Sequence, residues 1–163
     1  MQKNKTLPIA LFDQEEYLNK TSLNDTFVKN NNLPNIQQQF EICKEFLLMY
    51  RGSPDTFKSY RREIEKLCQW SWLIEKKSIL ELTRNDILNY IDFSSKPPLN
   101  WIATKSCPRF IIKDGERVRN NEWRPFLVRN SKIDAKNNIK LASAKQYKTS
   151  PASLRALFAG LGT

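Results

Sequence analysis

Three basic side chains are spaced four residues apart in a stretch with a strong helical pattern, SPDTFKSYRREIEKLCQW (residues 53–70). On a helical wheel of about 100° per residue, Lys58, Arg62 and Lys66 form one ridge along the helix. The opposite side carries Phe57, Tyr60, Ile64, Leu67, Cys68 and Ser71. Lysine and arginine at this spacing could bind the phosphate groups of a polyanion.

A basic ridge of this kind has two interpretations. It is normal on a helix face that is turned to water, where acidic neighbours such as Glu63 and Glu65 would form ion pairs with it. It is also what a helix needs in order to contact phosphates. The spacing leaves both interpretations open.

The absence of histidine narrows the chemistry that the chain can carry. Histidine is the usual base beside a Ser or Cys nucleophile, the easiest general acid or base near neutral pH and a common metal ligand. The three cysteines, Cys43, Cys68 and Cys107, show no CxxC spacing. We expect them to be reduced, with Cys43 and Cys68 buried on apolar helix faces, and we expect neither a metal site nor a cofactor.

The positive charge of the chain is concentrated in one segment. The formal net charge is +10 over 163 residues, and residues 96–148 hold thirteen Lys or Arg against four acids, a net of +9. Such an excess favours a polyanionic partner such as nucleic acid, or an acidic membrane surface. No apolar run approaches the length of a membrane span or of a secretory signal, so we expect a cytoplasmic protein with no membrane partner.

The elements that would position the ridge are helical. The pattern predicts helices at about 35–50, from 53 to about 72–74, and from 83 to just before 96. Ser53 is expected to cap the second helix, with Pro54 at its first position, and Thr83 with Asp86 forms a capping-box pair at the third. Residues 1–34 are rich in Asn, Lys and Thr and are expected to be a flexible lead-in.

The basic segment 96–148 breaks the helical pattern. Asp114-Gly115 stands between short alternating runs, which is typical of a tight β-hairpin. Trp101, Phe110, Trp123 and Phe126 indicate that part of the segment packs on something, and for the tryptophans as a group we favour core packing over base stacking. Residues 96–148 are nevertheless expected to be the most mobile or irregular part of the chain, apart from the hairpin.

A fourth helix is predicted in TSPASLRALFAGLGT (residues 149–163). The polar and basic residues around its start are Lys148, Thr149, Ser150, Ser153 and Arg155. Free N–H groups and the positive end of the helix dipole suit a phosphate there, although capping alone would also explain Thr149 and Ser150. Because the apolar pattern is still running at Thr163, we expect the sequence to be a piece of a longer protein.

Three stretches together, TFKSYRREIEKLCQW (residues 56–70), LTRNDILNYI (82–91) and TSPASLRALFAGL (149–161), resemble the N-terminal core-binding domain of tyrosine recombinases, the phage-integrase family. The resemblance implies a mainly α fold over residues 35–163. It would be a small SAM-like bundle of about four helices. The long basic insertion 96–148 between the third and fourth helices departs from the family pattern, since many relatives have a short turn there. In the family a separate catalytic domain follows, and that domain is expected to be absent here.

The resemblance also implies a function. The domain would bind double-stranded DNA and position the enzyme on its recombination site, beside other recombinase protomers, for DNA integration or recombination. The expected DNA contacts are Thr56, Lys58, Ser59, Arg62 and Lys66 of the second helix and Lys148, Thr149, Ser150, Ser153 and Arg155 of the fourth. None of the five tyrosines is expected to be the nucleophile, so we expect no strand cleavage by this chain alone.

Two other functions remain open at the level of sequence. The first is a structural or protein-interaction domain whose basic segment binds an acidic partner; binding that resists a large rise in salt would favour it. The second is an RNA-binding protein that uses the aromatic, basic hairpin region. The sequence lacks an RNP-like, KH-like or zinc-knuckle motif, which ranks the second lowest.

Overall fold

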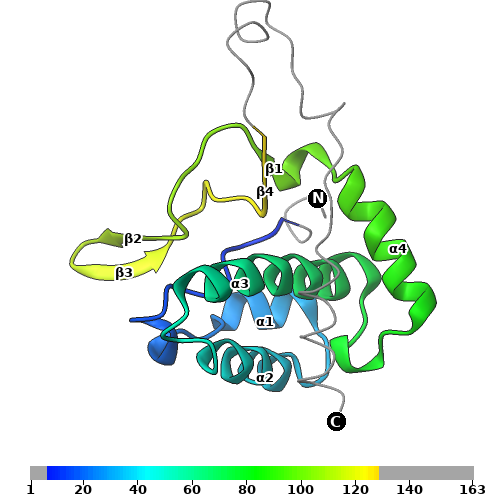
Figure 1. The fold of residues 1–163 in the computed structure, drawn as a ribbon, viewed down its shortest axis with the longest axis horizontal. Coiled ribbons are helices and arrows are strands. Elements are labelled where there is room, and N and C mark those ends of the chain that lie inside the picture. The colour runs from blue at the N-terminus through cyan, green and yellow to red at the C-terminus, as the bar shows by residue number, and fades with distance from the viewer. Residues whose placement is uncertain (1–6, 129–163) are drawn as a thin grey trace, which may run out of the picture.

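A pair of consecutive helices lies at the centre of the computed structural model, which describes residues 7–128 (Figure 1). The α-helices are α1 (Asp25–Asn31), α2 (Ile36–Leu48), α3 (Pro54–Gln69) and α4 (Arg84–Ser95). The strands are β1 (Ile102–Ala103), β2 (Phe110–Lys113), β3 (Glu116–Arg119) and β4 (Phe126–Leu127). Single 3-10 turns lie at Leu18–Lys20, Ile79–Glu81 and Leu99–Trp101. The expectation of a mainly helical chain is confirmed for the described residues.

The central pair is α2 and α3, joined by a short turn in which Gly52 has a φ of 95°. The predicted helices at 35–50 and from 53 onward are both confirmed. Cys43 of α2 and Cys68 of α3 meet in the fully buried interface, with their sulfur atoms 3.5 Å apart. Both thiols are free, as expected, and burial raises the pKa of Cys68 well above its usual range.

The two ends of α3 differ from the prediction in detail. Pro54 takes the first helical position, but the side chain of Ser53 makes no capping hydrogen bond. The backbone of Ser53 takes part in the ordinary way, since its carbonyl accepts the first helical hydrogen bond, from the N–H of Phe57 at 2.9 Å, and its N–H donates to the carbonyl of Tyr50 at 3.0 Å. At the other end the helix widens into a π-helical turn, Trp70–Glu75, which Lys76 closes in the left-handed conformation.

The predicted capping box at the start of α4 is confirmed. The hydroxyl of Thr83 accepts from the N–H of Asp86, and the carboxylate of Asp86 accepts from the N–H of Thr83 at 2.8 Å. Lys77 donates to the same carboxylate at 2.6 Å. The start of α4 is therefore held both by its own cap and by an ion pair to the segment before it.

The expectation of a flexible lead-in is wrong for residues 7–34. Leu11 and Phe12 are fully buried, and the ring of Phe12 stacks on Phe40 of α2 at 5.1 Å between centroids. α1 forms within this segment, capped by the side chain of Asn24, although no helix was predicted there. This segment has too few apolar residues to form a periodic pattern. They still hold it in place, because the rest of the core covers them.

The expectation of a mobile or irregular segment is wrong for residues 96–128, which are packed on the rest of the molecule. β1 pairs with β4 in parallel, and β2 pairs with β3 across the predicted turn, where Asp114 and Gly115 have φ angles of 52° and 80°. The four tryptophans are buried, as expected for core packing: Trp70, Trp72, Trp101 and Trp123. The predicted fourth helix and residues 129–148 lie outside the described residues.

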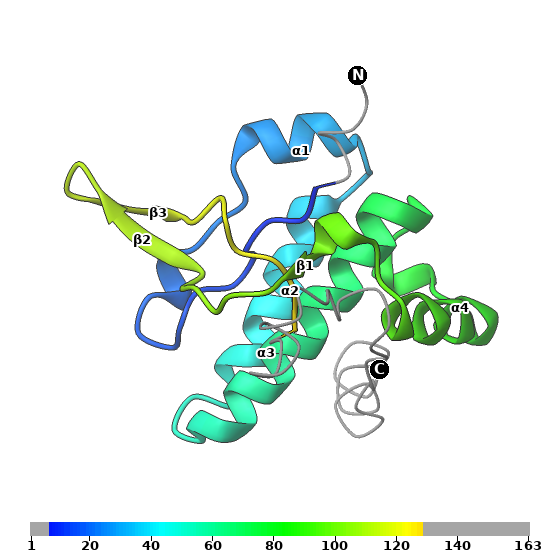
Figure 2. The ribbon, with the colours of Figure 1, turned by 90° about the horizontal axis from the view of Figure 1, so that it is seen from above.

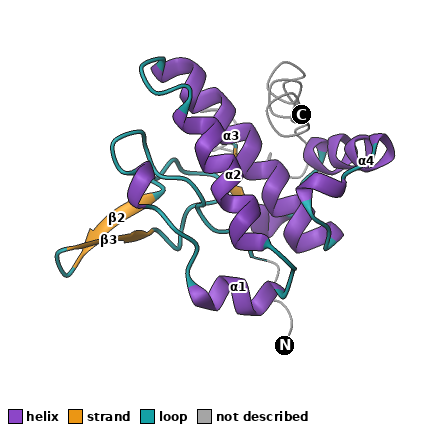
Figure 3. Cartoon of the chain, turned by 90° about the horizontal axis from the view of Figure 1, so that it is seen from below, coloured by secondary structure: helices purple, strands orange, loops and turns teal. Residues whose placement is uncertain are grey.

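The β2–β3 hairpin and α4 lie at opposite ends of the molecule. Figures 1, 2 and 3 all show the α2–α3 pair between them, and Figure 1 shows β1 and β4 side by side next to α3. This arrangement places residues from the two short strands and their flanking loops beside the N-terminal half of α3, where the predicted ridge begins.

Candidate functional site

A hollow of about 260 Å³ opens beside the N-terminal half of α3. Its walls come from α3 and from two segments of the strand region, residues 103–109 and 123–127. Six cationic side chains line it: Lys58, Arg61, Arg62, Lys105, Arg109 and Arg124. No Asp or Glu is part of this lining. The positive charges of two regions far apart in the sequence therefore meet at one place.

Two residues of the predicted ridge line this hollow. Lys58 is exposed, and Arg62, one turn further along α3, has a side chain that is 56% exposed. The nearest carboxylate to Arg62 is that of Glu63, at 4.0 Å, which is a weak pairing. Thr56 and Ser59, also predicted to contact DNA, are half-buried on α3 and are not part of the lining.

The third member of the ridge, Lys66, is not on an exposed face. Its side chain is only 11% exposed, with the Nζ atom 4.7 Å from the ring centroid of Phe126 and 3.9 Å from a carboxylate oxygen of Glu63. Burial lowers the pKa of Lys66. Placing it on a surface ridge was wrong because Phe126, at the start of β4, packs over the Lys66 side chain.

Arg61 is the residue of the hollow that the ridge pattern missed. Its Nε atom is buried, and no hydrogen-bond partner for it exists among the described residues. The guanidinium carbon lies 5.5 Å from the ring centroid of Phe57. The pKa of Arg61 is lowered to about 10, mainly by burial and secondly by the positive charge of Arg109. The side chain still carries its charge at neutral pH, in surroundings that solvate it poorly.

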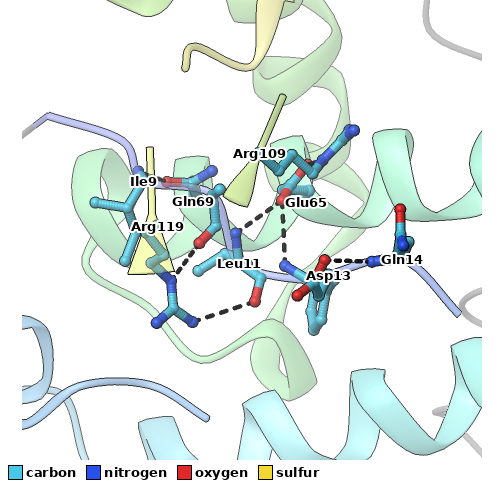
Figure 4. A network of polar contacts seen from close by, with 10 residues as sticks. Ile9, Leu11, Asp13, Gln14, Glu65, Gln69, Arg109 and Arg119 are labelled. Atoms are coloured by element: carbon cyan, nitrogen blue, oxygen red, sulfur yellow. Dashed lines mark hydrogen bonds and ion pairs between the residues drawn. The ribbon is translucent and has the colours of Figure 1, made fainter. Parts of the chain in front are cut away.

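Arg109 differs from Arg61 in having a carboxylate partner. Its Nε donates to Glu65 at 2.9 Å, and the Glu65 side chain is 1% exposed. The other oxygen of Glu65 accepts the backbone N–H groups of Leu11 at 2.8 Å and Phe12 at 3.3 Å (Figure 4). Glu65 thus joins α3, the N-terminal segment and one wall of the hollow. The interpretation in which the ridge faces water had placed Glu65 on the surface as an ion-pair neighbour.

The opposite wall is held by Arg124. Its Nη1 atom donates to the carbonyl oxygens of Asn121 at 2.8 Å and Trp123 at 2.7 Å, which fixes the loop before β4. Neither Arg124 nor Lys105 forms an ion pair within residues 7–128, and the same holds for Lys58 and Arg61. Four of the six cations in the lining therefore have no carboxylate to neutralise them in this part of the chain.

The hairpin arginines have a different role. Arg117 forms two hydrogen bonds with the carboxylate of Asp13, at 2.6 and 2.8 Å. Arg119 donates to three carbonyl oxygens, those of Ala10 at 2.5 Å, Leu11 at 3.3 Å and Ser22 at 2.8 Å. Two of the thirteen basic residues in the segment 96–148 thus hold the N-terminal segment in place.

The remaining predicted contacts, Lys148, Thr149, Ser150, Ser153 and Arg155, lie outside the described residues. Within residues 7–128 no three His, Cys, Asp or Glu side chains are grouped so that they could hold a metal ion. In the same range no helix is both long enough and apolar enough to span a membrane. A scan against protein-family models and searches of curated proteins and of solved structures find no match to this chain.

Proposed function

We propose that this chain is a duplex-DNA-binding domain that positions a tyrosine recombinase on its recombination site. The observation that carries the proposal is the hollow at the N-terminal half of α3, where six cationic side chains meet in a lining without a carboxylate. The same half of α3 is the part that the resemblance to core-binding domains assigns to DNA. The proposal includes a SAM-like bundle with 96–148 as an insertion, a cytoplasmic location and other recombinase protomers as partners.

The physical case for a polyanion is the lack of internal neutralisation. Lys58 has no acid within ion-pair distance among the described residues, and it shares the lining of the hollow with Arg61, Lys105 and Arg124, which have none either. Phosphates of a duplex supply closely spaced negative charges, and each one neutralised by Lys or Arg releases condensed counterions. Binding should therefore be strong at low salt and should weaken steeply as salt is added.

Selectivity for a site would require contacts to base edges. α3 is a straight helix of 16 residues with its exposed side next to the hollow, and a helix of this size fits the major groove. In the proposed complex, phosphate contacts from the hollow fix the position of α3, and a few of its side chains, with those of the predicted fourth helix, reach the bases.

The double variant Lys58→Ala plus Arg62→Ala tests the proposal. It should weaken binding to a labelled duplex and lower the slope of log K against log salt by nearly two, since each lost phosphate contact removes about 0.9. Folding should be nearly unchanged because both side chains are exposed. Fluorescence anisotropy at several salt concentrations measures both the affinity and the slope.

A matched control is available on the same chain. Lys29→Ala plus Arg84→Ala removes the same charge from two exposed residues of α1 and α4 that do not line the hollow. This control should change the slope far less than the test variant does. Equal slopes for the wild type and the Lys58/Arg62 variant would mean that this face is turned to water.

A second candidate, a protein-interaction domain, is favoured by one observation. The β2–β3 hairpin projects from the helical body, and on it Ile111 is 37% exposed and Ile112 is 64% exposed (Figure 1). Apolar side chains on a projecting edge are typical of a protein contact. Binding of an acidic protein with little salt dependence, together with no measurable duplex binding, would favour this function over the first.

A further inference from the structure

We propose that the hollow binds a single phosphate group and that Arg61 is its central ligand, with Arg62, Lys105 and Arg124 as the surrounding cations. The inference rests on the proposed function, because it takes the phosphate to be one of the DNA backbone. A free phosphate ion has the same chemistry, and the experiment below separates the two sources.

Arg61 is the strongest argument for a bound anion. A buried N–H without a partner is costly, and a buried charge without a counter-ion is more so. The Nε of Arg61 has no partner among the described residues, and the nearby Arg109 makes its charge less favourable still. An oxygen anion in the hollow would neutralise the charge of Arg61, because arginine binds phosphate through charge-assisted hydrogen bonds.

The protein's own carboxylates cannot take this place. Glu65 is the buried acid next to α3's basic residues, and it is already shared between Arg109 and the backbone N–H groups of Leu11 and Phe12. Glu63 is 5% exposed and lies nearest to Lys66 and Arg62. Neither acid lines the hollow. The positive charge around Arg61 is therefore left for a ligand.

The lining also favours a phosphate over a nucleobase. Trp123 is its one aromatic side chain, and the guanidinium of Arg109 lies against that ring at 5.2 Å from the centroid. The ring is 6% exposed, so it offers little surface on which a base could stack. Six of the twelve residues that line the hollow carry guanidinium or ammonium groups.

The inference changes the role of the strand region. Lys105 and Arg124 come from residues 103–109 and 123–127, on the opposite side of the hollow from α3. If all of these residues bind one phosphate, the region that departs from the core-binding pattern takes part in the DNA interface. The duplex would then contact α3 and this region together.

The test uses Arg61→Gln, with Arg84→Gln as a control of equal charge change on the exposed start of α4. Arg61→Gln should weaken duplex binding about tenfold or more and lower the salt slope by about 0.9, whereas Arg84→Gln should have little effect. Thermal melting of each variant without DNA reports whether it folds. Arg124→Gln, on the other wall of the hollow, should lower the salt slope by a similar amount. It replaces Arg61→Gln in the test if that variant does not fold.

The second part of the test uses inorganic phosphate as the ligand. At constant ionic strength, replacing chloride by phosphate should raise the melting temperature of the wild type more than that of Arg61→Gln, because phosphate stabilises folded proteins in general and a bound phosphate adds to that effect. Phosphate stabilisation that depends on Arg61, without duplex binding by the wild type, would overturn the DNA function and keep a free-phosphate site. Duplex binding with an unchanged slope and affinity in both Arg61→Gln and Arg124→Gln would overturn the phosphate site and keep the DNA function.

Discussion

The arginines of the hairpin and Arg61 of the hollow differ in how far the protein itself satisfies them. Arg117 and Arg119 are bound to Asp13 and to three backbone carbonyls, all within the protein. Arg61 has no carboxylate within ion-pair distance among residues 7–128, and its buried Nε has no hydrogen-bond partner there. Net charge shows that a chain suits a polyanion, but the internal partners of each cation show where that polyanion would bind.

Glu65→Gln should have the largest effect on stability, because it removes the buried negative charge that pairs with Arg109. Breaking a buried ion pair by removing one partner typically costs about 3–5 kcal/mol of unfolding free energy. The loss should be visible in urea denaturation. Glu81→Gln, an exposed acid outside any ion pair of the described residues, is the control and should stay within about 0.5 kcal/mol of the wild type. A Glu65→Gln variant as stable as the wild type would show that Arg109 does not depend on its partner.

Arg119→Ala tests whether a hairpin arginine contributes to stability and not to DNA binding. The variant loses hydrogen bonds to three carbonyls of the N-terminal segment and should lower the unfolding free energy by about 2 kcal/mol. Its salt slope for duplex binding should equal that of the wild type, because this arginine contacts no phosphate in the proposed complex. A slope lowered by about 0.9 without loss of stability would reverse the assignment.

The Lys77–Asp86 ion pair at the start of α4 should have the smallest effect on stability. Its contribution can be measured through the pH dependence of thermal melting. The hydrogen bond from Lys77, followed by that from the Thr83 backbone, lowers the pKa of Asp86. A lowered folded-state pKa stabilises the protein above the unfolded value of about 3.9, and this contribution is lost as the pH falls through the folded value. Thermal melting at a series of acidic pH values should therefore show a weaker acid dependence in Lys77→Gln. Superimposable profiles would mean that the pair contributes nothing.

Local signals in the sequence were enough for the three longest helices and for the hairpin turn. Helical periodicity predicted α2, α3 and α4, the Thr83–Asp86 pair predicted a cap, and Asp114-Gly115 predicted a turn. Each of these depends on residues a few positions apart, so a single stretch of sequence contains the whole cause.

The site depended on contacts that no local pattern contains. The wheel places Lys66 opposite Phe57 and so predicts exposure, but Phe126, sixty residues later, covers it. Lys105 and Arg124 reach the hollow through pairing of β1 with β4. One signal was present in the sequence: Arg61 lies four residues after Phe57, on the apolar side of the helix, where a basic residue is unusual.

The hydrogen bond from Arg119 to Ala10 joins residues 109 positions apart in the sequence. Closing a loop of that length costs chain entropy before any contact rewards it, so we expect this junction to form late in folding. α2 and α3 are neighbours in sequence and should pair earlier. In native-state hydrogen exchange, the amide protons of residues 9–12 should then exchange together with those of the β2–β3 hairpin, at a lower opening free energy than those in the middle of α3.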